Sequence, residues 1–131
     1  MIQKKILKKV IVPTVIAAAI LLGPGFIPRS HSQGLPNFVR GSKVCAINVN
    51  RLRASLGLSQ THSPAAISFL KLRRVSQPSI GTVRFNWRKG GAHVAVYAGH
   101  GMCWNPSSRH QRWMLKPCAS IWRGMKFQWR R

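Results

Sequence analysis

The sequence predicts a single α+β domain, in which two helices precede an antiparallel meander of strands. Three observations support this fold class. Apolar residues recur at helical spacing after residue 44, and the apolar period changes to two near residue 82. The chain has 131 residues, of which 45% are hydrophobic, and this length suits one small core better than two.

The two helices are expected at residues 45–56 and at residues 64 to about 72. In the first segment, apolar residues repeat every three or four positions, which places them on one helix face, and Gly57 fits a C-cap. In the second, Ser63 supplies an N-cap and Pro64 suits the first helical position. Both helices therefore precede every predicted strand.

Strands are expected from residue 82 onward. Val83, Phe85 and Trp87 alternate with polar neighbours, as in a half-buried strand. A Lys-Gly-Gly turn at residues 89–91 would reverse the chain into the next strand. The remaining expected elements are strands at 93–98, 102–105 and 125–129, with a loop rich in Pro, Ser and Arg at 106–120.

The amino terminus has the features of an export signal. Residues 1–9 contain four lysines, and residues 10–22 are almost wholly apolar. That run has about the length of a signal-peptide core and is short for a membrane span of ~20 residues. Ser30 and Ser32 place small residues before a cleavage point at Gln33; an uncleaved signal anchor is the alternative. The expected divisions are a signal peptide or signal anchor at 1–32, a linker at 33–43 and a folded domain at 44–131.

The charge of the chain has a single sign. It contains 22 Lys and Arg and no Asp or Glu. Without side-chain carboxylates it can form no glycosidase acid pair, no EF-hand, no acidic Mg²⁺ site and no Ser–His–Asp triad. Its net charge of +22 predicts a polyanionic partner, such as anionic lipid, a wall polymer or nucleic acid. Export to the periplasm, cell wall or medium makes nucleic acid the unlikely partner, and a membrane-tethered precursor is compatible with the same signal.

Cysteine usage agrees with an oxidising compartment. Of the three cysteines, Cys103 and Cys118 are close in sequence, and a disulfide between them would contribute about 3 kcal/mol. Cys45 would then be the free thiol, although three reduced, buried cysteines are the alternative. A zinc site at Cys103, Cys118 and His110 lacks any recognised ligand spacing, so no metal or other cofactor is expected.

The candidate catalytic residues are Cys45, His93 and Asn105. A cysteine at the first turn of a helix is favoured as thiolate by the helix dipole, and Lys43 and a histidinium would lower its pKa further. His93 follows two glycines that leave room for a substrate, and Asn105 could orient its imidazole. A buried structural thiol and a core or surface histidine are the alternatives. Three other residues compete for the third position: Trp104, His100 and His110.

Short motifs occur in a fixed order between residues 43 and 105. They are Cys45-Ala-Ile-Asn-Val-Asn50, the stretch from Ser63 to Leu70, Val75–Pro78 followed by Gly81–Val83, Gly90–Tyr97, and Asn105. In this order they resemble the NlpC-type papain-like cell-wall hydrolases, whose relatives are the CHAP-type amidases. The resemblance implies a papain-like core with a helix-borne cysteine packed on a small antiparallel sheet. It also implies that Cys45 is the nucleophile, His93 the base and Asn105 the third member, acting on peptidoglycan stem peptides.

The sequence therefore predicts an exported, monomeric cysteine peptidase or amidase that cleaves peptidoglycan. The first alternative is a non-catalytic cationic protein that binds walls or anionic membranes. The second is a basic nucleic-acid-binding protein of ribosomal type, which composition alone would favour. Four tryptophans of the basic tail could stack sugars or anchor in a membrane interface, or could simply be core: Trp104, Trp113, Trp122 and Trp129.

Overall fold

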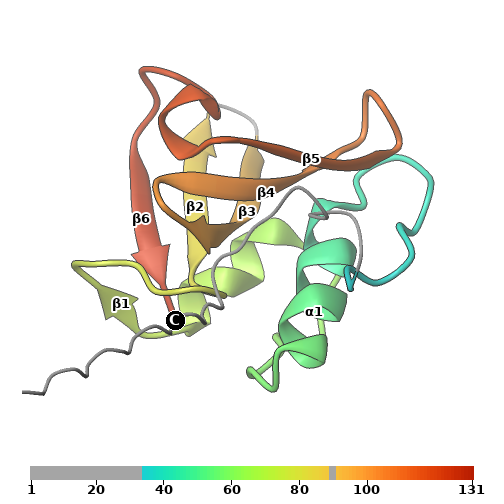
Figure 1. The fold of residues 1–131 in the computed structure, drawn as a ribbon, viewed down its shortest axis with the longest axis horizontal. Helices are drawn as coiled ribbons and strands as arrows, with labels where there is room; N and C mark the ends of the chain where they lie inside the picture. Colours follow the sequence, from blue (N-terminus) through green and yellow to red (C-terminus); the bar gives the residue numbers. More distant parts are fainter. Residues whose placement is uncertain (1–33, 89–90) are drawn as a thin grey trace, which may run out of the picture. The chain divides into compact units, whose positions relative to one another are not determined.

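The computed structural model describes residues 34–88 and 91–131, whose elements form one antiparallel sheet covered by short helices (Figure 1). The strand order is β1-β6-β2-β3-β4-β5. The predicted signal segment at 1–32 and residues 89–90 of the predicted turn lie outside the described residues. The elements are α1 (Cys45–Ser55), η4 (Ala66–Lys71), β1 (Arg74–Val75), β2 (Val83–Arg88), β3 (Gly91–Gly99), β4 (Met102–Ser107), β5 (Arg112–Pro117), η5 (Cys118–Ser120) and β6 (Phe127–Arg130).

The predicted α+β, papain-like fold class is wrong. The described chain is a small β-rich domain, built on a six-stranded antiparallel sheet with one short α-helix. The first predicted helix is present as α1, and the strands β2, β3, β4 and β6 occur near their predicted positions. The error lies in the second helix and in the number of strands.

The second helix is a 3₁₀ helix, η4, of six residues. Leu72 is already extended at its end (φ −76°, ψ 155°), and Ile67 remains 53% exposed. Only Ser68 and Phe69 of this segment are buried, and six residues are too few to sustain an α-helix by themselves.

The sheet gains a strand from the segment predicted to be a loop. Strand β5 pairs with β4 in register from Met102↔Pro117 to Ser107↔Arg112. Its sequence lacks clean alternation and carries charges at both ends, as edge strands often do. The segment of β5 is therefore extended because it pairs with β4, although its own sequence pattern does not predict a strand.

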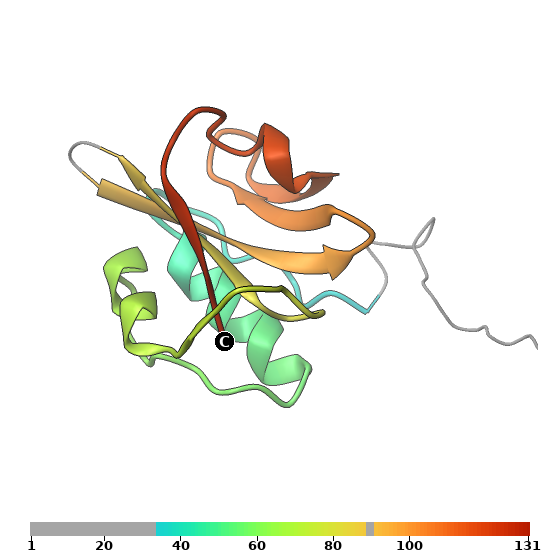
Figure 2. The ribbon, with the colours of Figure 1, turned by 90° about the vertical axis from the view of Figure 1, so that its left-hand side faces the viewer.

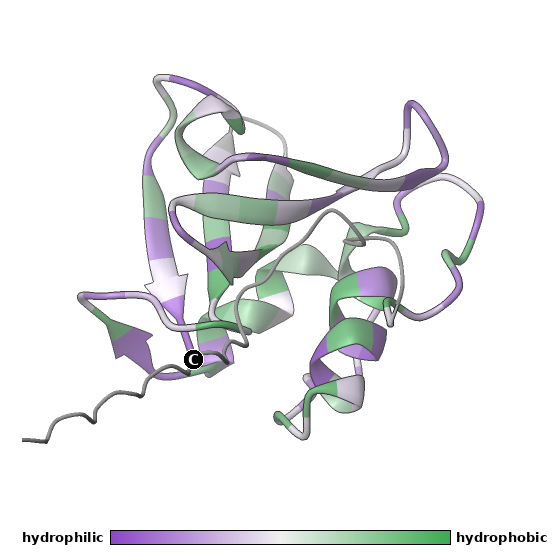
Figure 3. Ribbon diagram, viewed as in Figure 1, coloured by the Kyte–Doolittle hydropathy of each residue, from purple (hydrophilic) through white to green (hydrophobic). Residues whose placement is uncertain are grey.

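The sheet separates two apolar clusters. On one face, Val83, Phe85, Val94 and Val96 pack against α1 and Phe69 of η4. On the other face, the second cluster consists of Ala95, Cys103, Cys118 and Ile121. Figure 2 shows α1 and η4 on one side of the sheet and the η5 segment on the other. Along α1, hydrophobic and hydrophilic bands follow one another (Figure 3). Its buried apolar residues Ala46, Val49 and Leu52 belong to the cluster on the sheet.

Two buried arginines show how the fold accommodates cations without acidic side chains. Arg53 of α1 is 0% exposed, and its guanidinium donates to main-chain oxygens of Ser59 (2.9 Å), Gly81 (2.7 Å) and Arg131 (2.9 Å). Burial lowers the pKa of Arg53 to about 10, and the nearby Arg131 charge contributes to this shift. Arg84 of β2 lies with its guanidinium carbon 3.7 Å from the centre of the Phe127 ring. Main-chain oxygens and aromatic faces thus surround these cations in place of acidic side chains.

None of the helices in residues 34–88 and 91–131 has the length and hydropathy needed to cross a bilayer.

Candidate functional site

Cys45 is the first residue of α1 and is partly exposed. No side chain caps this end of the helix, since Val44 occupies the N-cap position. The thiol instead receives hydrogen bonds from the main chain of Val94, Ala46 and Cys45 itself. The sulfur therefore lies at the positive end of the helix dipole and beside strand β3.

A split in the sheet makes room for this sulfur. The pairing of β3 with β4 ends at Val96↔Trp104, although both strands continue past that point. The main-chain N–H and C=O of Tyr97 bond toward β2, to Thr82 (2.8 Å) and Gly81 (2.9 Å). Consecutive residues of a strand direct their main-chain groups to opposite sides. Val94, three residues before Tyr97, therefore directs its N–H toward β4.

Pro106 accounts for the end of the ladder. If the β3–β4 register continued beyond Val96↔Trp104, Pro106 would lie opposite Val94. Proline has no N–H to donate at that position. Strand β4 instead keeps its pairing with β5 through Pro106↔Trp113. The N–H of Val94 is consequently not engaged by β4 and hydrogen-bonds to the thiol of Cys45.

His93 and Asn105 lie on the two strands that border this split. His93 Nε2 is 2.6 Å from Asn105 Oδ1. An amide oxygen can only accept, so Nε2 carries the proton and Nδ1 is the basic nitrogen of the ring. Trp122 stacks on the imidazole, with ring centroids 4.9 Å apart and planes inclined by 25°. The imidazole is thus held by a hydrogen bond at one edge and an indole on one face.

Cys45 and His93 line the same pocket, which has a volume of about 760 Å³. Residues 64–67, at the start of η4, and Trp122 also line it. Lys43 is the charged residue of the lining. Gly91 also lines it, and a Cβ placed there would meet no atom within 4 Å, so glycine leaves space beside the imidazole.

The state of the thiol differs from the sequence expectation. Burial raises the pKa of Cys45 above its ordinary value of 9.0, and the three main-chain hydrogen bonds only partly oppose this effect. The prediction of a lowered pKa is therefore wrong, because desolvation outweighs the helix dipole and hydrogen bonds. The resting sulfur is a neutral thiol, which needs a base to become a nucleophile.

Other residues considered for the third position lie elsewhere. His100 is an exposed turn residue with φ of 53°, and His110 Nδ1 is 2.9 Å from the hydroxyl of Ser107. Trp104 packs against the cluster on the α1 face of the sheet. Asn105 is the one of these four residues that is shown within hydrogen-bonding distance of His93.

The predicted disulfide is confirmed. Cys103 and Cys118 are bridged with Cα atoms 5.0 Å apart, and Cys45 is free. The two bridged sulfurs cannot be metal ligands, and among the described residues no group of three His, Cys or acidic side chains could hold a metal ion. The bridge joins β4 to η5 and so anchors the segment that carries Trp122.

Sequence reasoning missed Trp122 as a partner of His93 and Pro106 as the cause of the split. For Trp122, as for the three other tryptophans, the sequence left three roles open: stacking on sugars, anchoring in a membrane interface, or packing in the core. A signal was present in each case, because Trp122 follows a predicted disulfide cysteine and Pro106 follows a predicted strand. Neither signal indicates which distant side chain would be affected.

Comparison with known proteins does not assign the chain to a family. No protein-family model matches the chain, and no curated protein matches it.

Proposed function

We propose that this protein is an exported cysteine amidase or peptidase that hydrolyses amide bonds in peptidoglycan stem peptides. The observation that carries the proposal is the pocket shared by Cys45 and His93, with Asn105 hydrogen-bonded to the imidazole. A nucleophile, a base and an orienting amide are the parts that thiol catalysis needs. The proposal includes kinship with NlpC-type hydrolases, which is supported by the order of the sequence motifs.

The raised pKa of Cys45 favours a reaction that starts from a neutral thiol and a neutral imidazole. His93 takes the thiol proton as the sulfur attacks the amide carbonyl, so that an S–C bond forms and negative charge moves to the carbonyl oxygen. Main-chain N–H groups at the start of α1 can stabilise that oxyanion. The imidazolium then protonates the leaving amine as the C–N bond breaks. His93 then deprotonates a water molecule as it attacks the thioester carbonyl. The C–S bond breaks, the carboxylic acid product is released, and the imidazolium returns its proton to the sulfur of Cys45.

Asn105 acts in this scheme as a positioning residue. Its acceptor fixes the proton on Nε2 and stabilises the imidazolium that forms during the reaction. Because the chain has no carboxylate, an amide takes the role that aspartate fills in many hydrolases. We expect N105A to lower kcat by about 10- to 100-fold with a smaller effect on KM, and N105D to recover part of the loss.

The charge of the chain supports a wall polymer as substrate. Stem peptides carry carboxylates, and a +22 chain with Lys43 at the pocket would concentrate on such a surface. Salt should weaken this attraction. We expect a monomer that needs no cofactor and that does not use nucleic acid as its partner.

Purified cell walls provide the test. Wild type should release soluble amines, and C45A and H93A should release almost none. The matched control is H62N, which changes an exposed histidine outside the pocket and should retain full activity. Equal release by wild type and C45A would refute catalysis by this thiol.

A non-catalytic cationic protein that binds walls or membranes is the second candidate. The observation that favours it is the neutral, partly buried state of Cys45. If this candidate is right, wall binding or lysis survives C45A and H93A and is abolished when surface lysines and arginines are replaced by glutamine.

A further inference from the structure

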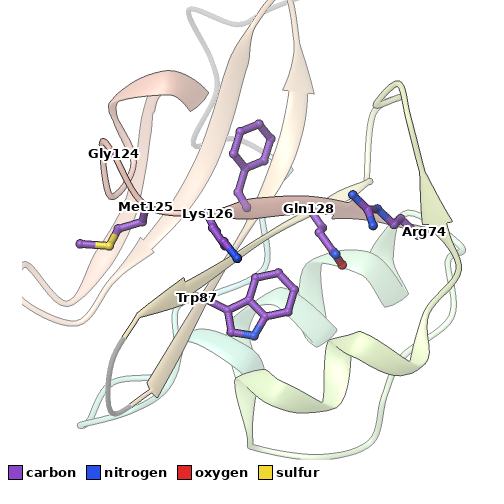
Figure 4. A pocket seen from close by; sticks show the side chains of 7 residues that line it. Arg74, Trp87, Gly124, Met125, Lys126 and Gln128 are labelled. Carbon is purple, nitrogen blue, oxygen red and sulfur yellow. The ribbon is translucent and has the colours of Figure 1, made fainter.

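A second groove lies beside β6 and shares no lining residue with the pocket of Cys45. Its volume is about 630 Å³, and it is lined by Arg74 of β1, Trp87 of β2 and residues 124–128. Figure 4 shows Lys126, Gln128 and Trp87 near one another in this groove, with Arg74 at one end. A neighbouring hollow of about 540 Å³ shares Arg74 and Gln128 and extends along β1.

The polar side chains of this groove present hydrogen-bond donors. Arg74 and Lys126 are exposed cations. The oxygen of the Gln128 amide already accepts from Arg130, at 3.0 Å from Nε and 2.6 Å from Nη2. This fixes the amide so that its NH₂ group is the end offered to a ligand. Two cations and an amide donor, with no acidic residue in the chain to neutralise them, select an anion.

Trp87 adds a supported aromatic surface. Its ring packs edge-on against buried Phe85, with centroids 4.6 Å apart, and its main-chain N–H donates to the Lys126 oxygen at 3.1 Å. The indole therefore has a defined position and is only half-buried. An aromatic plane beside polar donors suits a ligand that has both an apolar face and charged or hydroxyl groups.

We propose that this groove binds an acidic sugar, namely a carboxylate-bearing residue of a glycan chain. The carboxylate would contact Arg74, Lys126 and the Gln128 amide nitrogen, and the sugar ring would lie on Trp87. Single-stranded nucleic acid would need a series of stacking surfaces. Phe127 also lines the groove, and Trp129 lines the neighbouring hollow. The pairing of β6 with β2 nevertheless places both rings on the opposite face from Trp87, where the Arg84 guanidinium lies 3.7 and 5.8 Å from their centroids, so they do not extend the stacking surface of Trp87.

The groove and the pocket of Cys45 are close neighbours along the β2–β3 hairpin. Trp87 pairs directly with Ala92, and Ala92 lines the pocket. A glycan whose carboxylated, peptide-free residue is held in the groove could therefore present the peptide of a neighbouring residue toward Cys45. The identity of the glycan as peptidoglycan rests on the proposed function, whereas binding of a carboxylated sugar does not.

Binding is measured with C45A protein, so that catalysis plays no part. The probes are a short oligogalacturonide and peptide-free peptidoglycan glycan strands, and the affinity of each is measured by calorimetry at fixed salt. We expect R74Q/K126Q to weaken binding about tenfold or more, because hydrogen bonds from a cation to a carboxylate are stronger than those between neutral groups. The matched control R109Q/R112Q removes two exposed charges outside the groove and should weaken binding less than about threefold.

Two further measurements separate this site from general charge attraction. Q128E replaces the donor by an acceptor of the same shape and should weaken binding about tenfold while keeping the hydrogen bonds from Arg130. W87F should remove the fluorescence quenching that the oligogalacturonide produces. The proposal would be overturned if R74Q/K126Q and R109Q/R112Q weakened binding equally, or if Q128E bound as tightly as its parent. It would also be overturned if an uncharged cello-oligosaccharide bound with the same affinity, or if a single-stranded oligonucleotide of equal charge bound more tightly. Absence of wall hydrolysis by the wild type, together with intact binding by C45A, would refute only the proposed enzyme.

Discussion

The Cys103–Cys118 disulfide provides the most direct test of the fold, because its contribution to stability follows from its position. The two residues are separated by 15 positions in sequence, and closing a loop of that length contributes about 3 kcal/mol to the free energy of unfolding in the chain-entropy model. Each kcal/mol shifts the Tm of a domain of about 100 residues by roughly 4–8 °C. The double variant C103A/C118A should therefore melt about 12–24 °C below wild type.

Far-UV circular dichroism during heating measures this difference. Wild type treated with a reductant should show a similar decrease in Tm, since reduction opens the same loop without removing atoms. C45A is the control, because its thiol lies outside the bridge and its removal should leave the Tm sensitive to reductant. A drop of less than about 4 °C in both the double variant and the reduced protein would refute the reasoning. It would mean that the β4–β5 ladder alone holds the segment that carries Trp122.

Two further predictions concern buried groups. Burial raises the pKa of Cys45 above its ordinary value of 9.0, so iodoacetamide labelling of the native protein should accelerate only above pH 9; a midpoint below pH 8 would contradict this. The unfolded chain loses this proton first, so the stability contributed by the neutral thiol should decline as pH rises above about 9, and C45S should lack that decline. R53M removes the donors to the oxygens of Ser59, Gly81 and Arg131 and should lower the free energy of unfolding by about 3 kcal/mol in urea titrations. A decrease below about 1 kcal/mol would show that those oxygens find other donors.

Local sequence patterns predicted several elements well. The helical spacing after residue 44 predicted α1, and alternation predicted β2, because each pattern reports a face that a single element must bury. The same patterns predicted neither β5 nor the shortness of η4. The segment of β5 contains Arg, Lys and Pro beside its apolar residues, and only the partner strand β4 makes it extended.

The candidate site was predictable in its parts and not in its electrostatics. Cys45, His93 and Asn105 were selected from residue chemistry and motif order, and the pocket and the 2.6 Å distance between His93 and Asn105 are consistent with that selection. The direction of the Cys45 pKa shift was not predictable. It depends on how much of the thiol the surrounding segments exclude from water, and no spacing in the sequence reports that.

The sequence by itself determined the single-sign charge of this protein and the place of its helix, and it predicted, beside an alternative, which two cysteines pair. Tertiary structure alone decided that the β3–β4 pairing ends before Pro106, that the Val94 main chain bonds to the Cys45 thiol, and that Trp122 stacks on His93. The reason is physical: composition and periodicity act within one segment, whereas strand pairing, burial and ring stacking join residues that are far apart in the chain.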